Sequence, residues 1–207
     1  TGYFSQVGDC YGFRTACIGA CRQIEAHSEA LQGDAMERIH VMTGVRFKPE
    51  HLIERLSRKK KFHCLSCRYV SALYSPCWIF EFRVLLQASK NTSRYAGYYA
   101  GVDELNMAPG KIQILPGAEE RVVPACSVLK SKSNEKEAAG MAWDYNKNWI
   151  TIKYKNLYAP PVLEEYKAHL YYKILYLMEF YNQECKETKY MVLDSLTGDL
   201  EKVMESE

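Results

Sequence analysis

The hydrophobic positions in the first third of the chain repeat at the spacing of an α-helix. Between Asp9 and Gly33, apolar residues return every three or four positions, and these two residues are suited to begin and to end a helix. A second stretch begins at Pro49, carries apolar residues at the same spacing and ends in the basic run 58–61. The pattern therefore predicts two helices in this part of the chain.

From residue 69 onward, large apolar residues alternate with charged or small ones, which is typical of β-strands. Polar connections divide this region into three strand-like segments, at 69–86, 95–102 and 111–115. We expect these segments to form a three-stranded antiparallel meander.

The last third of the chain has a similar order of patterns. Residues 149–154 alternate like a strand, Pro160-Pro161 ends that strand, and helical spacing resumes over 162–172. Three further strand-like segments follow, at 174–181, 190–193 and 199–203. This order predicts a third helix followed by a second meander.

The two predicted meanders share the pattern Tyr-x3-aromatic-x2-Glu-Phe. It occurs at Tyr74, Trp78, Glu81 and Phe82, and again at Tyr172, Tyr176, Glu179 and Phe180. The predicted fold class is α+β, a duplicated unit of one helix plus a three-stranded antiparallel meander, with an extra N-terminal helix. Its parts are an N-terminal helical segment (1–48), a first unit (49–129), a polar connection (130–148) and a second unit (149–207), packed as one domain.

Two segments resemble a known type of module. They are Tyr190-Met191-Val192-Leu193-Asp194-Ser195-Leu196-Thr197-Gly198 and, in the first copy, Ser75-Pro76-Cys77-Trp78 with Val102-Asp103. These segments resemble the PepSY-type module and the Pro-x-Trp hairpins that follow some bacterial zinc ribbons, over about a third of the chain. The first copy departs from the pattern, because Pro109-Gly110 replaces the Thr-Gly pair. Such modules bind, inhibit or brace other proteins, so the resemblance implies an interaction role and no chemistry.

Composition supports a folded protein with few distinguishing features. Of 207 residues, 47% are hydrophobic and 25% are charged, which is an ordinary globular mixture. The net charge of +2 does not indicate a nucleic-acid partner, and the basic run 58–61 is interpreted as a solvated helix end. No apolar window is long enough for a transmembrane helix. The first residue is Thr1, which fits a processed N-terminus, and we expect an intracellular location in the cytoplasm or inside an organelle.

The cysteines offer one candidate metal site. Cys64-x-x-Cys67, to which His63 could add a nitrogen, could bind zinc together with Cys17 and Cys21, which are spaced to lie on one helical face, or with Cys10. Two alternatives stay open: a disulfide or redox pair at Cys64 and Cys67, or unlinked buried thiols. Apart from this structural zinc we expect no cofactor.

The sequence contains no recognisable set of catalytic residues. The five histidines are scattered, and neither a phosphate-binding glycine loop nor a nucleophile elbow occurs. The sixteen tyrosines are more distinctive, since tyrosine is enriched at protein interfaces. The residues expected at such an interface are Tyr74, Trp78, Tyr95, Tyr98, Tyr99, Tyr172 and Tyr176.

We therefore predict a non-catalytic protein-interaction protein or accessory subunit. It would present a tyrosine-rich sheet face to a partner in a larger assembly, and no small-molecule substrate is evident. The alternative is a thiol redox or zinc-containing enzyme that uses the Cys64/Cys67 pair.

Overall fold

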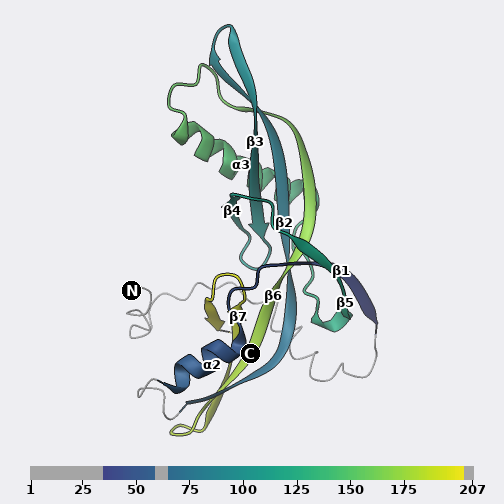
Figure 1. The fold of residues 1–207 in the computed structure, drawn as a ribbon, viewed down its shortest axis with the longest axis vertical. Helices are drawn as coiled ribbons and strands as arrows, with labels where there is room; N and C mark the ends of the chain where they lie inside the picture. The colour runs from purple at the N-terminus through teal and green to yellow at the C-terminus, as the bar shows by residue number, and fades with distance from the viewer. Residues whose placement is uncertain (1–34, 59–64, 203–207) are drawn as a thin grey trace.

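The computed structural model of the protein describes residues 35–58 and 65–202, and strands dominate it (Figure 1). The helices are α2 (Pro49–Ser57), the short 3-10 helix η2 (Ala125–Ser127) and α3 (Glu135–Lys153). The strands are β1 (Met36–Met42), β2 (Leu65–Ser89), β3 (Thr92–Asp103), β4 (Ala108–Ile112), β5 (Ala118–Pro124), β6 (Val162–Asn182), β7 (Glu187–Asp194) and β8 (Leu200–Lys202). In this part of the chain they form one mixed sheet of eight strands.

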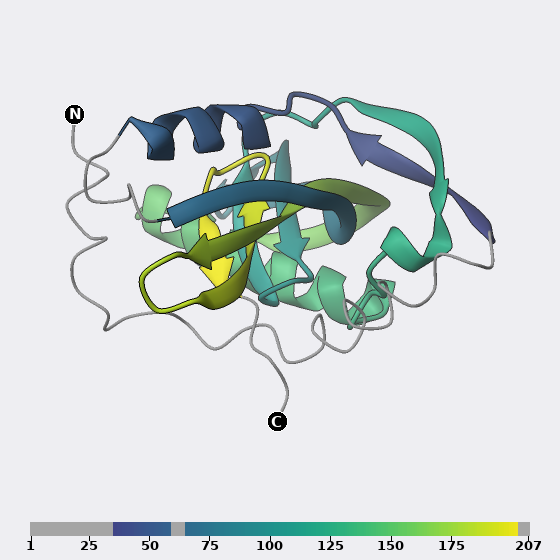
Figure 2. The same ribbon diagram turned by 90° about the horizontal axis from the view of Figure 1, so that it is seen from below.

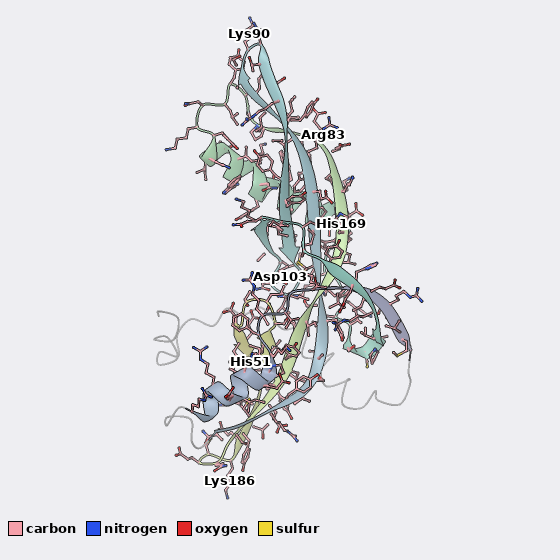
Figure 3. The ribbon with its side chains drawn as sticks, in the orientation of Figure 1. His51, Arg83, Lys90, Asp103, His169 and Lys186 are labelled. Atoms are coloured by element: carbon pink, nitrogen blue, oxygen red, sulfur yellow. The ribbon has the colours of Figure 1, made fainter. Side chains whose placement is uncertain are left out.

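Two long antiparallel strands, β2 and β6, run through the length of the molecule (Figure 1). They pair from Leu65↔Asn182 at one end to Leu85↔Val162 at the other, with two β-bulges. At the end that carries Lys90, called here the upper half, β3 pairs with β2 and β4 pairs with β3 (Figure 3). In the lower half, β7 pairs with β6 and β8 pairs with β7. Each long strand therefore carries its own hairpin partner at a different end.

The register makes this ribbon nearly symmetric about its centre, where Ser75 pairs with Lys173. A half-turn about that pair exchanges β2 with β6 and β3 with β7. The same half-turn exchanges Asp103, the last residue of β3, with Asp194, the last residue of β7. The two aspartates consequently approach the centre of the ribbon from opposite sides.

One face of the ribbon is covered by two helices and a pair of strands and is called here the helix face. In the upper half, α3 packs on a cluster that includes Phe80, Phe82 and Val84. In the lower half, α2 places Leu52 and Ile53 against another cluster. Between the two helices, β1 and β5, which are distant in the sequence, pair as an antiparallel two-stranded arm that stands out to one side of the ribbon (Figures 1 and 2). The central leucines of the opposite face form their own buried cluster, made of Leu73, Leu105, Leu129, Leu175, Leu177 and Val192.

Helix α3 begins with a complete capping box. The Asn134 side chain accepts a hydrogen bond from the Glu137 backbone at 3.0 Å, and the Glu137 carboxylate accepts one from the Asn134 backbone at 3.2 Å. The buried stripe of the helix is Ala138, Ala142, Asn146 and Ile150, each four residues apart. The alanines of this stripe let the helix lie close to the sheet.

The predicted fold class, α+β with a duplicated helix-plus-meander unit and an extra N-terminal helix, is wrong. Most described residues belong to strands of one sheet, and the sheet includes β1 and β5, which were not predicted. Residues 162–172, predicted as a helix, belong to β6, and residues 149–154, predicted as a strand, fall mainly within α3. The predicted helix between Asp9 and Gly33 lies outside the described residues.

Two physical features explain these errors. The core face of α3 is built largely from alanine, which gives a weak hydrophobic signal, so the region 130–148 was interpreted as a polar connection. The upper half of β6 is mostly exposed, from residue 162 to 167, and therefore lacks the alternation of a half-buried strand.

Candidate functional site

The face of the upper sheet that points away from α3 is the strongest candidate site, and is called here the open face. It is formed by alternate residues of the three adjacent strands β6, β2 and β3, and its polar and aromatic members are Glu81, Arg83, Tyr95, Tyr99, Glu165, Lys167 and His169. Gly97 pairs with Arg83 and has no side chain, which leaves a shallow hollow of about 220 Å³ beside these residues. Figure 3 shows Arg83 and His169 on this part of the ribbon.

An ion pair and a histidine–carboxylate contact across the strands organise the open face. Arg83 Nη1 lies 3.2 Å from Glu165 Oε1, and its guanidinium group lies 4.4 Å from the centroid of the Tyr95 ring. His169 Nε2 lies 2.9 Å from Glu81 Oε1, and the His169 ring stacks on Tyr171. Exposed pairs of this kind contribute roughly 0–1 kcal/mol each, so their main effect is to fix side-chain positions rather than to hold the fold.

The open face combines charged and aromatic side chains. The His169–Glu81 pair is the kind of pair that acid–base chemistry uses, and the residues that line the hollow include Glu165, Lys167 and Tyr99. The hollow is open to solvent. What the face offers is a fixed pattern of both charges beside an exposed aromatic ring.

A second cluster of charges is buried at the centre of the ribbon. Lys173 Nζ lies 2.6 Å from Asp103 Oδ2 and 2.6 Å from Asp194 Oδ2, and the Lys173 side chain is only 7% exposed. Burial opposes its charge, but the two carboxylates outweigh burial and raise the pKa of Lys173 above its ordinary value. The lysine is therefore firmly protonated and is unsuited to act as a nucleophile or a general base. It joins the two hairpins, because Asp103 ends β3 and Asp194 ends β7.

The seven residues predicted to form one interaction face lie in three places. Tyr95 and Tyr99 belong to the open face. Trp78 and Tyr98 pack against the cluster beneath α3. The remaining three, Tyr74, Tyr172 and Tyr176, pack beside β1 on the helix face. Side chains alternate between the two faces of a strand, so residues one position apart, such as Tyr98 and Tyr99, point to opposite faces.

Of the four predicted zinc ligands, only Cys67 is among the described residues; Cys17, Cys21 and Cys64 lie outside them. Burial raises the pKa of Cys67 to about 11, so its thiol is protonated at neutral pH, which weighs against a nucleophilic role for this sulfur. Within the described ranges, no group of three or more histidine, cysteine or acidic side chains is arranged to hold a metal ion.

Sequence reasoning missed both charge clusters. Residues 162–172, which include His169, were predicted as a helix, so the pairing of His169 with Glu81 on the adjacent strand was not predicted. The useful signal was the internal repeat, which aligns Asp103 with Asp194. When β2 and β6 are paired antiparallel about the Ser75–Lys173 pair, the same repeat brings His169 next to Glu81. Lys173, the cation that the two aspartates share, lies at that same centre.

Comparison with protein-family models, with curated proteins and with solved structures gives no match for this chain. The resemblance to PepSY-type modules and Pro-x-Trp hairpins therefore stays a prediction. Among the described helices, none combines the length and the apolar character needed to cross a membrane.

Proposed function

We propose that this protein is a non-catalytic interaction protein or accessory subunit that binds a protein partner through the open face. The single observation that supports the proposal is the arrangement of Arg83, Glu165, Glu81 and His169 as two cross-strand pairs beside the hollow at Gly97. Fixed charges of both signs select a partner with the complementary pattern and disfavour others.

The aromatic side chains of the open face add contact area. Tyr95 is 54% exposed and lies against the Arg83 guanidinium, so its ring is already oriented. Tyrosine and arginine are enriched in interface cores because each combines a large contact surface with polar groups. An intracellular location and membership of a larger assembly belong to the same proposal.

Site-specific photo-cross-linking tests this function. A benzoylphenylalanine placed at Tyr99 should give a discrete cross-linked product in an extract of cells that make the protein. The same group placed at Val122, which is 57% exposed on β5, is the control and should not give that product. The double variant Arg83→Glu/Lys167→Glu, which reverses two exposed charges of the open face, should abolish the product.

Three results would count against the proposal. One is the same set of products from Tyr99 and Val122, which would indicate collision rather than binding. The second is a product that survives the charge reversal in Arg83→Glu/Lys167→Glu. The third is the absence of any product from Tyr99 in a native extract.

A further inference from the structure

A second surface lies on the helix face, where the end of α3 meets β3 and β4. The Trp149 ring has two ammonium groups near it, Lys111 Nζ at 3.9 Å from its centroid and Lys153 Nζ at 4.8 Å. The neighbouring Tyr154 ring has Lys153 Nζ at 5.1 Å and the Arg94 guanidinium at 5.8 Å. Cations and aromatic rings thus alternate across three elements. This group, with Tyr98, is called here the basic aromatic cluster.

Contacts with β3 and with the buried core hold the rings of the cluster in place. Tyr98 meets Trp149 edge-on, with ring centroids 6.0 Å apart, and a side-chain hydrogen bond joins it to Tyr154. Burial, and then this hydrogen bond, raise the pKa of Tyr98 to about 12, while the same hydrogen bond lowers the pKa of Tyr154. Ile150, one position from Trp149, is fully buried and anchors the end of α3. The cluster is therefore a preformed platform.

In the described part of the chain, no ion pair with a carboxylate balances these charges. The segment from residue 145 to residue 163 contains no aspartate or glutamate, although it contains Lys147, Lys153 and Lys155. Among the ion pairs found in the described part of the chain, none includes Arg94, Lys111 or Lys153. The whole chain carries a net charge of only +2, so this local excess of positive charge is a feature of the fold.

We propose that the basic aromatic cluster binds single-stranded nucleic acid. Proteins that bind such strands without sequence preference combine cations that follow the phosphates with aromatic rings on which bases stack. Both components are present here at contact distance, and Lys111 belongs to β4, the edge strand of the sheet, where a strand of nucleic acid can approach. The lysine side chains are flexible, so when a base stacks on the Trp149 ring, the ammonium groups can leave the ring and contact the phosphates instead.

An anionic lipid surface fits the same cations less well. Binding at a membrane interface needs a row of apolar side chains that enter the lipid. The exposed side of the last turns of α3 presents Lys147, Asn148, Thr151 and Ile152, of which only Ile152 is apolar. The proposal is also independent of the open face, since the cluster lies on the opposite side of the sheet.

Fluorescence anisotropy with a labelled 20-nucleotide oligo-dT tests the proposal directly. The wild-type protein should bind the oligonucleotide at low salt. Because each phosphate contact contributes a slope of about −0.7 in a plot of log K against log salt for single strands, three cations predict a slope of about −2. The double variant Lys111→Glu/Lys153→Glu should lower the affinity at least tenfold.

Matched controls separate binding from folding. Lys130→Glu/Lys136→Glu makes the same change of charge at two exposed positions near the start of α3 and should bind like the wild type. Trp149→Leu removes the stacking platform and should weaken binding about fivefold or more with little change of the salt slope. Circular dichroism melts show whether each variant is folded.

Several outcomes would overturn the proposal. They are absence of binding by the wild type at low salt, equal loss of affinity in the cluster variant and in the charge-matched control, and binding to phosphatidylserine vesicles without binding to the oligonucleotide. The last outcome would reassign the cluster to a membrane surface. None of them bears on the cross-linking result for the open face.

Discussion

Replacing Lys173 by methionine should destabilise the protein by about 3–4 kcal/mol. The substitution keeps most of the side-chain volume but leaves two carboxylates without their cation, and breaking a buried ion pair in this way typically costs about 3–5 kcal/mol. Asp194 is only 12% exposed and would lose most of its compensation, whereas Asp103 is 27% exposed and would be partly hydrated by water. This difference places the expected loss in the lower part of that range.

Urea denaturation monitored by tryptophan fluorescence measures the effect. For a chain of this size the melting temperature should also fall, by roughly 2–4 °C for each kcal/mol. Lys167→Met, which removes an exposed lysine from the same strand, is the matched control and should change stability by less than about 0.5 kcal/mol. A loss below about 1 kcal/mol for Lys173→Met would refute the view that this lysine holds the two hairpins together.

The remaining predictions concern single positions. At Gly101 a Cβ atom would lie 2.8 Å from Ile112 Cδ1 of β4 and 3.1 Å from the backbone oxygen of Trp78, and the backbone oxygen cannot move aside as a side chain can. Gly101→Ala should therefore cost about 1–3 kcal/mol in urea denaturation. Gly97→Ala on the same strand meets nothing within 4 Å and should be nearly neutral; equal effects would contradict this. Asn134→Ala removes the cap of α3 and should cost about 1 kcal/mol, measured in the same way. Burial raises the pKa of Cys77 to about 12, so in the native protein a maleimide should label the exposed Cys185 and leave Cys77 unmodified until unfolding, as peptide mass spectrometry would show.

The dependence of stability on pH follows from the raised pKa of Lys173. A cation whose pKa is higher in the folded state than in the unfolded state stabilises the fold fully at any pH below its unfolded value, here 10.5. That contribution is lost as the pH rises through the folded-state value. Wild type and Lys173→Met should therefore differ most between neutral pH and pH 10 and converge in strongly alkaline solution.

Some elements could be predicted from the sequence because their patterns are local. The alternation over 69–86 marks the central part of β2, and Pro49 with its basic C-terminal run marks α2. In α3 and the upper half of β6 the local pattern was misleading, because alanine builds the buried stripe of α3 and β6 is half exposed. Tertiary packing decides the structure of such segments, and local patterns in a single sequence do not reveal that packing.

The candidate sites were harder to predict for a different reason. Glu81 and His169 are 88 positions apart, and Lys111 and Trp149 come from an edge strand and a helix end. Each contact depends on the register of β2 against β6 or on where α3 lies on the sheet. Residue types alone revealed the excess of tyrosine, but they did not reveal which tyrosines share a face.

The pairing of Ser75 with Lys173 means that the two halves of the ribbon cannot be interchanged at their centre. Two lysines there would bring two ammonium groups together beside the same pair of aspartates, and two serines would leave both carboxylates without a cation. One lysine and one serine, placed in two different hairpins of one covalent chain, let a single cation serve both aspartates. A ribbon assembled from two identical copies of either hairpin would lack this arrangement of one lysine between two aspartates. The stability of the natural ribbon therefore depends on a difference between two halves that are otherwise related by a half-turn.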